Sequence, residues 1–537
     1  MHCLDVKLRL FTVENKVLRE ATPMLHKGYC IRGKSIYVIW GICCVCILSL
    51  ILFFSHVQYA CKQPLENVFL LLCLGLIGIG CLTVCVFRVC KNHKIHFIIP
   101  ALLGLLFFVF QLFAVRSYYF YTKWEVDGIV ASAYQAAAGE EITAYSYSIY
   151  PNNLLIASLF SGIFRLSASI GLTKSQSYGM LLAIQCLISY ASGLITFSLV
   201  RKITSNSVLA FLAYLLYLLL IGLSPWVSIP YTDAWGLFFP VAILWLYVQK
   251  PATSRMNYVR WAMIGLLALI GYKIKPTVMI TFIAIVLVEA FLAFRSVGLK
   301  KLLSHAAACA AGFLVGLLLF LAIVSTFSYK VDKRWAMGPA HFFAMGLNEE
   351  KQGYNSAEDV FYSLSFDTQL SRARGDMQLA MSRLQKMGFT GFCKQVARKL
   401  LTDYSDGSFA WTMEEVGNNA FFWKVREETD AVFSPWIRSF YYEDGSRFRQ
   451  FINFETALWF AILFLCFLAV FSPFEKTQSV LMMCLAGLFF YNVLFEARAR
   501  YLYTYGPLYV ALAVCGIRMI VQKKNSFLDG FRQKGQK

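Results

Sequence analysis

The sequence contains little charge for its length, and acidic residues are particularly scarce. Only 15% of its 537 residues are charged, and 30 Asp and Glu stand against 50 Lys and Arg. Soluble proteins carry about 25% charged residues. Hydrophobic residues make up 58% of the chain, which excludes a soluble enzyme, a disordered protein and a small disulfide-linked domain. The composition therefore predicts an α-helical polytopic membrane protein.

Motifs typical of metal sites are also missing. No His-Glu-x-x-His motif occurs, and no Cys-x-x-Cys pair with zinc spacing occurs outside the apolar runs that hold most of the 16 cysteines. The seven histidines show no ligand spacing. No cofactor is therefore predicted, and a divalent cation is left open. The chain also lacks an Asn-x-Ser/Thr sequon, which weakly favours a bacterial protein.

Long apolar runs dominate what is present. A helix that crosses a bilayer needs about 20 apolar residues. Such runs predict about twelve transmembrane helices, at 36–55, 67–87, 97–116, 177–200, 207–223, 233–249, 260–273, 276–294, 306–327, 451–471, 478–495 and 504–521. The stretch 152–170 is also apolar, but Arg165 and several serines give it a polar side. It is therefore expected to lie on the membrane surface as a juxtamembrane helix.

The distribution of basic residues predicts the topology. With 152–170 on the surface, the short basic loops at 88–94, 201–202, 250–260 and 295–301 lie on one side of the membrane, together with both termini. Short loops rich in Lys and Arg are usually cytoplasmic. The chain is accordingly expected to be a multi-pass protein of the cell membrane with both termini in the cytoplasm.

This topology divides the chain into tails, transmembrane regions and an outer cap. The predicted parts are cytoplasmic tails at 1–35 and 522–537, transmembrane regions at 36–327 and 451–521, a first outer loop at 117–176, and a small extracytoplasmic cap at 328–450. Residues 371–401 of the cap are expected to be helical and the remainder rich in loops. The cap holds 16 basic and 16 acidic residues, so the net charge of +20 reflects topology and no nucleic-acid partner is expected.

Unusual polar residues concentrate in the segments expected on the outer face. These segments are Trp-Glu-Val-Asp-Gly at 124–128, Tyr-Pro-Asn-Asn-Leu at 150–154, Pro-Tyr-Thr-Asp at 230–233, Gly-Tyr-Lys-Ile-Lys-Pro-Thr at 271–277 and Glu-Ala-Arg-Ala-Arg-Tyr at 496–501. Charges near a membrane are costly and normally face a cavity or a partner. Carboxylates and cations gathered at one face are typical of a site for an anionic lipid headgroup.

The order of these segments resembles the GT-C glycosyltransferases, in particular the protein mannosyltransferases and the aminoarabinose lipid A transferases. Asp127 matches the acidic residue of their first outer loop, and 150–153 matches a Tyr/Pro-rich patch that opens a juxtamembrane helix. The segment 496–501 is similar to a late outer turn of bacterial relatives. The sequence departs from these families in two ways. Two predicted spans precede the span that leads into the acidic loop, where the family's minimal plan has none. A single Asp replaces the Asp-Glu pair that is common in the mannosyltransferases.

The resemblance implies a GT-C-like fold and a sugar transfer from a polyprenyl-phosphate donor. The acceptor would be a cell-envelope glycopolymer or another extracytoplasmic molecule, and the reaction an inverting single displacement among membrane lipids. Asp127 would be the general base, because an acceptor hydroxyl must lose its proton. Cations would hold the leaving phosphate. The implied substrate-binding residues are Tyr150, Asn152, Asn153, Lys273, Lys275, Glu496, Arg498, Arg500 and Tyr501, of which Lys275, Arg498 and Arg500 would clamp the phosphate.

Structural roles are the alternative for each candidate. Asp127 and Asp233 are each suited to cap a helix N-terminus, and capping is the favoured interpretation for Asp233. Lys273 and Lys275 have the character of interface lysines. The arginines at 498 and 500 are alternatively partners of Glu496.

Three further segments or residues have open interpretations. Glu289 and Glu455 lie within spans, where pairing between helices and lining of a lipid groove are equally favoured. Residues 403–407 resemble half of a calcium loop, but a turn is the stronger prediction because the distal Glu is missing.

Two other functions compete with sugar transfer. The first is a transporter or flippase for a lipid-linked oligosaccharide. The sequence of such a protein should show two similar halves with broken helices at matched positions. This sequence shows no such symmetry, and its polar residues lie at one face. A non-catalytic envelope scaffold is the second, and a deep outer cavity that opens to lipid would distinguish an enzyme from it.

Overall fold

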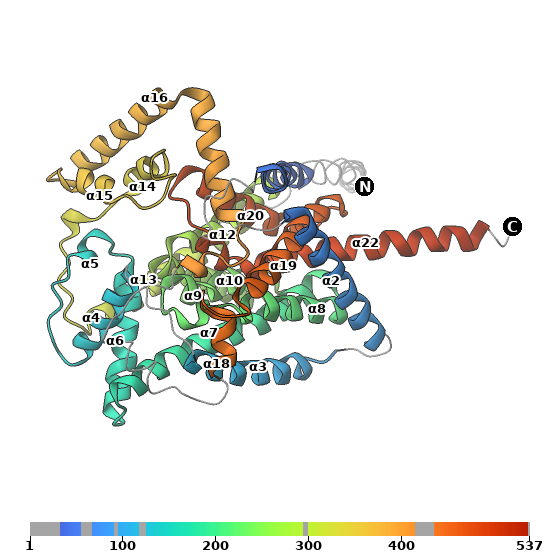
Figure 1. The fold of residues 1–537 in the computed structure, drawn as a ribbon, viewed down its shortest axis with the longest axis horizontal. Coiled ribbons are helices and arrows are strands. Elements are labelled where there is room, and N and C mark those ends of the chain that lie inside the picture. Colours follow the sequence, from blue (N-terminus) through green and yellow to red (C-terminus); the bar gives the residue numbers. More distant parts are fainter. Residues whose placement is uncertain are drawn as a thin grey trace, which may run out of the picture.

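The computed structural model describes residues 33–54, 67–90, 95–117, 125–293, 299–413 and 434–534. Within these residues every regular element is a helix, apart from one isolated bridge between Ile142 and Tyr329. Figure 1 shows a body of helices with a smaller helical cap, α14 to α16, above one end. The predicted α-helical class is therefore confirmed.

Eight helices in the described part of the chain are long and apolar enough to cross a membrane. They are Gly33–Phe54, α2 (Val68–Val89), α3 (Ile98–Ser117), α7 (Lys174–Thr204), α13 (Leu299–Val324), α19 (Phe448–Leu468), α20 (Lys476–Leu494) and α22 (Gly506–Lys534). These eight coincide with eight of the twelve predicted spans.

Three of the other predicted spans are shorter or interrupted helices. They are α8 (Ser207–Tyr217) with the π-helix η1 (Leu218–Gly222), α9 (Thr232–Gly236) with α10 (Phe238–Val248), and η3 (Pro276–Val278) with α12 (Met279–Ala293). The fourth is α11 (Ser254–Ile274), which is 21 residues long but is not among the eight helices. The expected surface helix at 152–170 is α6 (Asn153–Ser169), a 17-residue helix. Length and composition thus support eight spans, and the full count of twelve stays a prediction.

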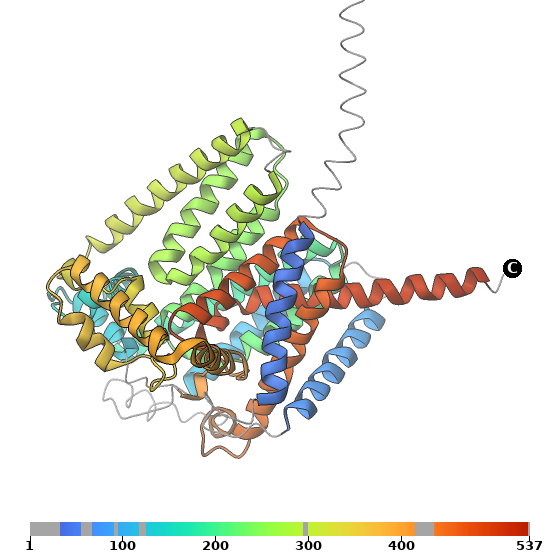
Figure 2. The same ribbon diagram turned by 90° about the horizontal axis from the view of Figure 1, so that it is seen from above.

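The first part of helix α22 occupies the middle of the body, and the rest projects out of it (Figures 1 and 2). It packs against α7, α8, α19 and α20, and every residue of 508–514 is fully buried. Helices α11 and α13 form a second close pair, and Figure 2 shows the yellow-green helices of residues 254–324 side by side. A Cβ at Gly312 would collide with the backbone of Ala262. Small residues allow such close backbone contact between membrane helices.

Two acidic residues expected within spans make contacts between elements. The carboxylate of Glu289 on α12 accepts a hydrogen bond from the Tyr247 hydroxyl at 2.7 Å and pairs with the Lys476 ammonium at 2.7 Å. Glu455 on α19 accepts a bond from the indole of Trp411 at 2.9 Å, in η5 (Trp411–Met413). Glu289 thus pairs with a cation of α20, whereas Glu455 makes a hydrogen bond to a tryptophan.

The cap is built from η4 (Lys333–Trp335), α14 (Pro339–Gly346), α15 (Ala357–Leu364) and α16 (Gln369–Tyr404), and α18 (Ser434–Tyr441) follows it. The helix expected at 371–401 is confirmed as part of α16. This helix bends at Gly388, whose φ of 60° lies in the left-handed region that glycine tolerates. Beyond the bend, α16 descends from the cap to α20 (Figure 1).

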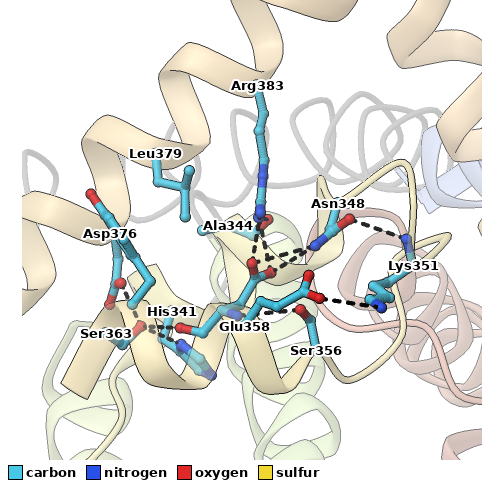
Figure 3. Close-up of polar contacts among 12 residues, drawn as sticks. His341, Ala344, Asn348, Lys351, Ser356, Glu358, Ser363, Asp376, Leu379 and Arg383 are labelled. Carbon is cyan, nitrogen blue, oxygen red and sulfur yellow. Dashed lines mark hydrogen bonds and ion pairs between the residues drawn. The ribbon is translucent and has the colours of Figure 1, made fainter. Parts of the chain in front are cut away.

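Buried polar contacts hold the cap helices together (Figure 3). The Arg383 guanidinium bonds both carboxylate oxygens of Asp359, at 2.6 and 3.0 Å, and Asn348 donates to the same carboxylate. The Ser363 hydroxyl lies 2.7 Å from the His341 ring and donates to Asp376 at 2.6 Å. Burial lowers the pKa of His341 to about 4, so its ring is neutral at pH 7 and the network binds α14, α15 and α16 without an added charge.

The turn predicted at 403–407 lies slightly later in the chain, because α16 continues to Tyr404 and the turn residues are 407–410. One carboxylate oxygen of Asp406 accepts a hydrogen bond from the backbone N–H of Ser408 at 2.8 Å, and the other accepts from that of Ala410 at 2.9 Å. These bonds stabilise Phe409 and Ala410 at positive φ values of 53° and 62°. The Asp406 carboxylate therefore supports the loop that leaves α16.

Candidate functional site

A carboxylate on a helix within the first outer loop begins the site. Helix α4 (Glu125–Ala137) packs against α6, and Glu125 lies in its first turn. One carboxylate oxygen of Glu125 accepts hydrogen bonds from the Asn153 amide at 2.9 Å and from the Tyr231 hydroxyl at 2.6 Å. The Asn152 amide donates to Asn153 at 3.0 Å. The predicted asparagines are thus joined to an acidic residue of the first outer loop.

Asp127, the predicted base, lies two residues further along α4. Because α4 includes Glu125, Asp127 lies within the first turn and is not the residue that caps the helix. Residues two positions apart in an α-helix are separated by about 200° around its axis, so the side chains of Asp127 and Glu125 point in different directions. Asp127 is half-buried, and its assignment as base stays a prediction.

Asp233 forms the centre of a buried charge cluster. Its side chain is fully buried, one oxygen accepts a bond from the Lys275 ammonium, and the other lies 3.8 Å from Nε of Arg500. The interpretation of Asp233 as a helix cap is wrong, because Tyr231 is the N-cap residue of α9 and Asp233 lies inside that helix. The Asp233 carboxylate instead pairs with Lys275, which lies 42 residues further along the chain.

Aromatic rings surround these cations. The Arg500 guanidinium lies 5.3 Å from the ring centroid of Tyr231, and the Lys275 ammonium lies 4.5 Å from that of Tyr501. Burial lowers the pKa of Lys275 to about 8, and the nearby Asp233 carboxylate opposes this shift. The rings replace part of the hydration that the cations lose.

The segment at 496–501 supplies the remaining charged groups, between α20 and α21 (Arg500–Tyr503). Glu496 accepts a hydrogen bond from the Tyr501 hydroxyl at 2.8 Å and lies 3.3 Å from Nε of Arg498. The Arg498 guanidinium lies 4.9 Å from the ring centroid of Tyr354, which belongs to the cap. The Arg498 side chain is 32% exposed, against 13% for Arg500, so Arg498 is the more accessible of the two arginines.

The Tyr150 phenol is affected by two carboxylates of the site, Glu125 and Glu496. Burial raises the pKa of its phenol, and the negative charges of Glu125 and Glu496 add to that effect. Lys273 has different neighbours, because its ammonium lies 4.6 Å from the ring centroid of Phe320 on α13. Of the two lysines in the 271–277 segment, Lys275 therefore joins the charged groups.

We call these residues the polar cluster. Its members are Glu125, Tyr150, Asn153, Tyr231, Asp233, Lys275, Glu496, Arg498, Arg500 and Tyr501. Three formal positive charges face three formal negative charges, and all come from the connections at one end of the membrane helices. Among the described residues, no group of three or more His, Cys, Asp or Glu side chains is placed to hold a metal ion.

A family model described as "Conserved hypothetical integral membrane protein" matches residues 42–520 of this sequence. The chain belongs to that family. No curated protein and no solved structure matches it. Membership of an integral membrane protein family agrees with the eight apolar helices and accounts for the apolar surfaces that they expose.

The sequence had only partial signals for several members of the polar cluster. Glu125 stands two residues before Asp127, and local pattern does not distinguish which of the two faces α6. Tyr231 lies two residues before Asp233 in the polar segment 230–233. Nothing in that segment predicts the hydrogen bond from Tyr231 to Glu125. Lys399 on α16 also approaches the cluster. Lys399 and Asp403 stand four residues apart in a segment expected to be helical, and this spacing places them on one helix face.

Proposed function

We propose that the protein is a membrane glycosyltransferase that moves a sugar from a polyprenyl-phosphate donor to an extracytoplasmic acceptor such as a cell-envelope glycopolymer. The observation that carries this proposal is the pair Arg498 and Arg500, which lie at one end of the membrane helices beside the carboxylates of the polar cluster. The GT-C resemblance of the same segments supports it.

The length of the Arg498 ion pair favours an anionic ligand. Charge-assisted N–H···O bonds are normally about 2.7–2.9 Å long, and Nε of Arg498 lies 3.3 Å from Glu496. A phosphate offers several oxygens to Arg498 and to Arg500 beside it, and it forms a stronger bond with Arg498 than this pair does. Because a polyprenyl chain requires lipid, a phosphate site next to membrane helices is well placed for such a donor.

The proposed reaction is a single displacement at the anomeric carbon. The acceptor oxygen forms a bond to that carbon while the bond between the carbon and the phosphate oxygen breaks. A carboxylate takes the acceptor proton. The phosphate leaves with the polyprenyl chain, and Lys275, Arg498 and Arg500 stabilise its developing negative charge. One displacement inverts the configuration, so no carboxylate nucleophile is required.

Two carboxylates of α4 are candidates for the base. Asp127 is the candidate from the resemblance, and Glu125 is the one joined to Asn153 and Tyr231. We retain Asp127 as the base and assign Glu125 to positioning, because the Asn153 amide and the Tyr231 hydroxyl already occupy one Glu125 oxygen. The Glu125 carboxylate would then orient the substrate-binding asparagine.

Matched variants test this assignment. Asp127→Asn should reduce sugar transfer by about 10²–10⁴-fold, the usual contribution of a general base, and should remove the acidic limb of the pH–rate profile. Glu125→Gln should reduce transfer and retain that limb. Transfer from a radiolabelled polyprenyl-phosphate sugar would be measured in membranes with equal amounts of each protein. A lost limb in the Glu125 variant, with the Asp127 variant near wild type, would exchange the two roles.

The rival function is transport of a lipid-linked oligosaccharide. The polar cluster lies at one end of the helices, whereas transporters place their sites near the bilayer midplane. Vesicles that contain the protein should transfer sugar without moving the lipid-linked sugar to the other leaflet. Movement without transfer would contradict the proposal and favour the transporter.

A further inference from the structure

Lysine 399 on the descending half of α16 holds the end of α20. Its ammonium is buried and donates hydrogen bonds to the backbone carbonyls of Val493 at 2.8 Å and Phe495 at 2.5 Å. These carbonyls belong to the last turn of α20, where no further helical N–H is available to bond them. A lysine that satisfies such carbonyls fixes the direction in which the chain leaves the helix.

Other parts of the cap hold the same segment from its other side. The backbone N–H of Ala497 donates to the carbonyl of Gly353 at 3.0 Å. Gly353, with a φ of 79°, packs against the Lys399 side chain. Tyr354 lies under the Arg498 guanidinium. Bonds from the cap therefore flank Glu496 on both sides, at 495 and at 497, and reach the arginine that follows.

Charged groups around Lys399 come from two elements. Asp403 lies one turn further along α16, is fully buried, and has no hydrogen-bond partner for either carboxylate oxygen among the described residues. The backbone N–H of Arg498 approaches it without completing a hydrogen bond. Glu496 faces the same ammonium from the 496–501 segment. The charges of Asp403 and Glu496 therefore both act on the buried Lys399 ammonium.

We propose that Lys399 is a positioning residue, through which the cap sets the conformation of 493–501 and so holds Arg498 and Arg500 where they bind a phosphate. The conformational part of this inference stands on the contacts of Lys399 alone. The phosphate part rests on the proposed function.

The charge of Lys399 gives the proposal a pH dependence. Burial lowers the pKa of Lys399 to about 8, against the opposing effect of Asp403 and Glu496. As pH rises through 8 the ammonium loses its charge, while Arg498 stays charged. The surroundings of the phosphate site then become more negative, so phosphate affinity should fall. Lys275 changes in the same direction, and a Lys399 variant separates the two contributions.

Hydrogen exchange and ligand binding test the proposal together. In detergent-solubilised full-length protein, Lys399→Met should raise amide exchange at 493–497 and weaken binding of farnesyl phosphate by about tenfold or more, the usual effect of losing a charged hydrogen bond. Lys399→Gln retains a hydrogen-bond donor without charge, so it should partly protect the amides of 493–497 from exchange. Its affinity for farnesyl phosphate should fall less above pH 8 than that of the wild-type protein. Lys394→Met, an exposed position on the same helix, is the control and should change neither measurement.

The possible results are distinguishable. Unchanged exchange at 493–497 in the Met variant would overturn the conformational part, and raised exchange with wild-type farnesyl phosphate affinity would overturn the positioning part. If the Met variant fails to fold, the wild-type protein still decides, because constant affinity between pH 7 and 9 would overturn the role of Lys399. If wild-type protein binds farnesyl phosphate no better than farnesol, the proposed function fails, and the exchange result alone tests the conformational part.

Discussion

Replacing Arg500 with alanine tests the phosphate site at the more enclosed of its two arginines. The side chain is 13% exposed, lies over the ring of Tyr231 and stands 3.8 Å from Asp233. A charge-assisted bond to phosphate in such a partly dry place is worth about 1.5–3 kcal/mol. Arg500→Ala should therefore raise the Kd for a polyprenyl phosphate about ten- to more than a hundredfold.

The cost to folding should be smaller than the cost to binding. Asp233 keeps its bond to Lys275 when Arg500 is removed, so no buried carboxylate is left without a partner. Arg500→Lys should restore binding only in part, because an ammonium offers a point charge without the planar pair of donors.

The assay is a titration of each purified protein with farnesyl phosphate in detergent micelles, with farnesol as the reference for binding of the chain alone. Arg374→Ala, at an exposed position on α16, is the matched control and should leave the Kd unchanged. Wild-type affinity of the Arg500→Ala protein, at normal yield and thermal stability, would refute the assignment of this arginine to phosphate.

Two further predictions concern packing and topology. Gly312→Leu should destabilise the α11–α13 pair by at least about 1–3 kcal/mol, because its side chain meets the backbone of Ala262; thermal unfolding in detergent should show the loss, whereas Gly78→Leu, in open space on α2, should unfold like wild type. An alkaline phosphatase reporter fused after Asp367 should be active and one fused after Lys537 inactive; the reverse pattern would place the polar cluster on the cytoplasmic side.

The sequence was sufficient for the helical class and for most of the long helices. Lipid offers no partner for backbone groups, so apolar runs of about 20 residues can adopt little other than a helix. The run at 306–327, for example, appears as α13. The shorter helices were harder to assign, because a run such as 207–223 is helical first in α and then in π geometry, and local hydropathy does not distinguish these.

The segments of the polar cluster were also visible in the sequence, but the contacts among them were not. Asp233 precedes an apolar run, which is the local pattern of a cap, and its bond to Lys275 depends on how α9 meets the end of α11. The choice between Glu125 and Asp127 depends on the face that α4 presents to α6. Lys399 lies about a hundred residues from the carbonyls it binds. Such contacts follow from tertiary packing, which no local spacing encodes.

Sugar transfer to the envelope can be tested by measuring the sugar composition of the cell envelope in a strain that lacks this protein. A side-chain sugar should disappear from an envelope glycopolymer. The wild-type gene should restore it, and a gene with Arg498→Ala and Arg500→Ala, at equal membrane levels, should not. An unchanged envelope composition, or full restoration by the double variant, would contradict sugar transfer through this phosphate site.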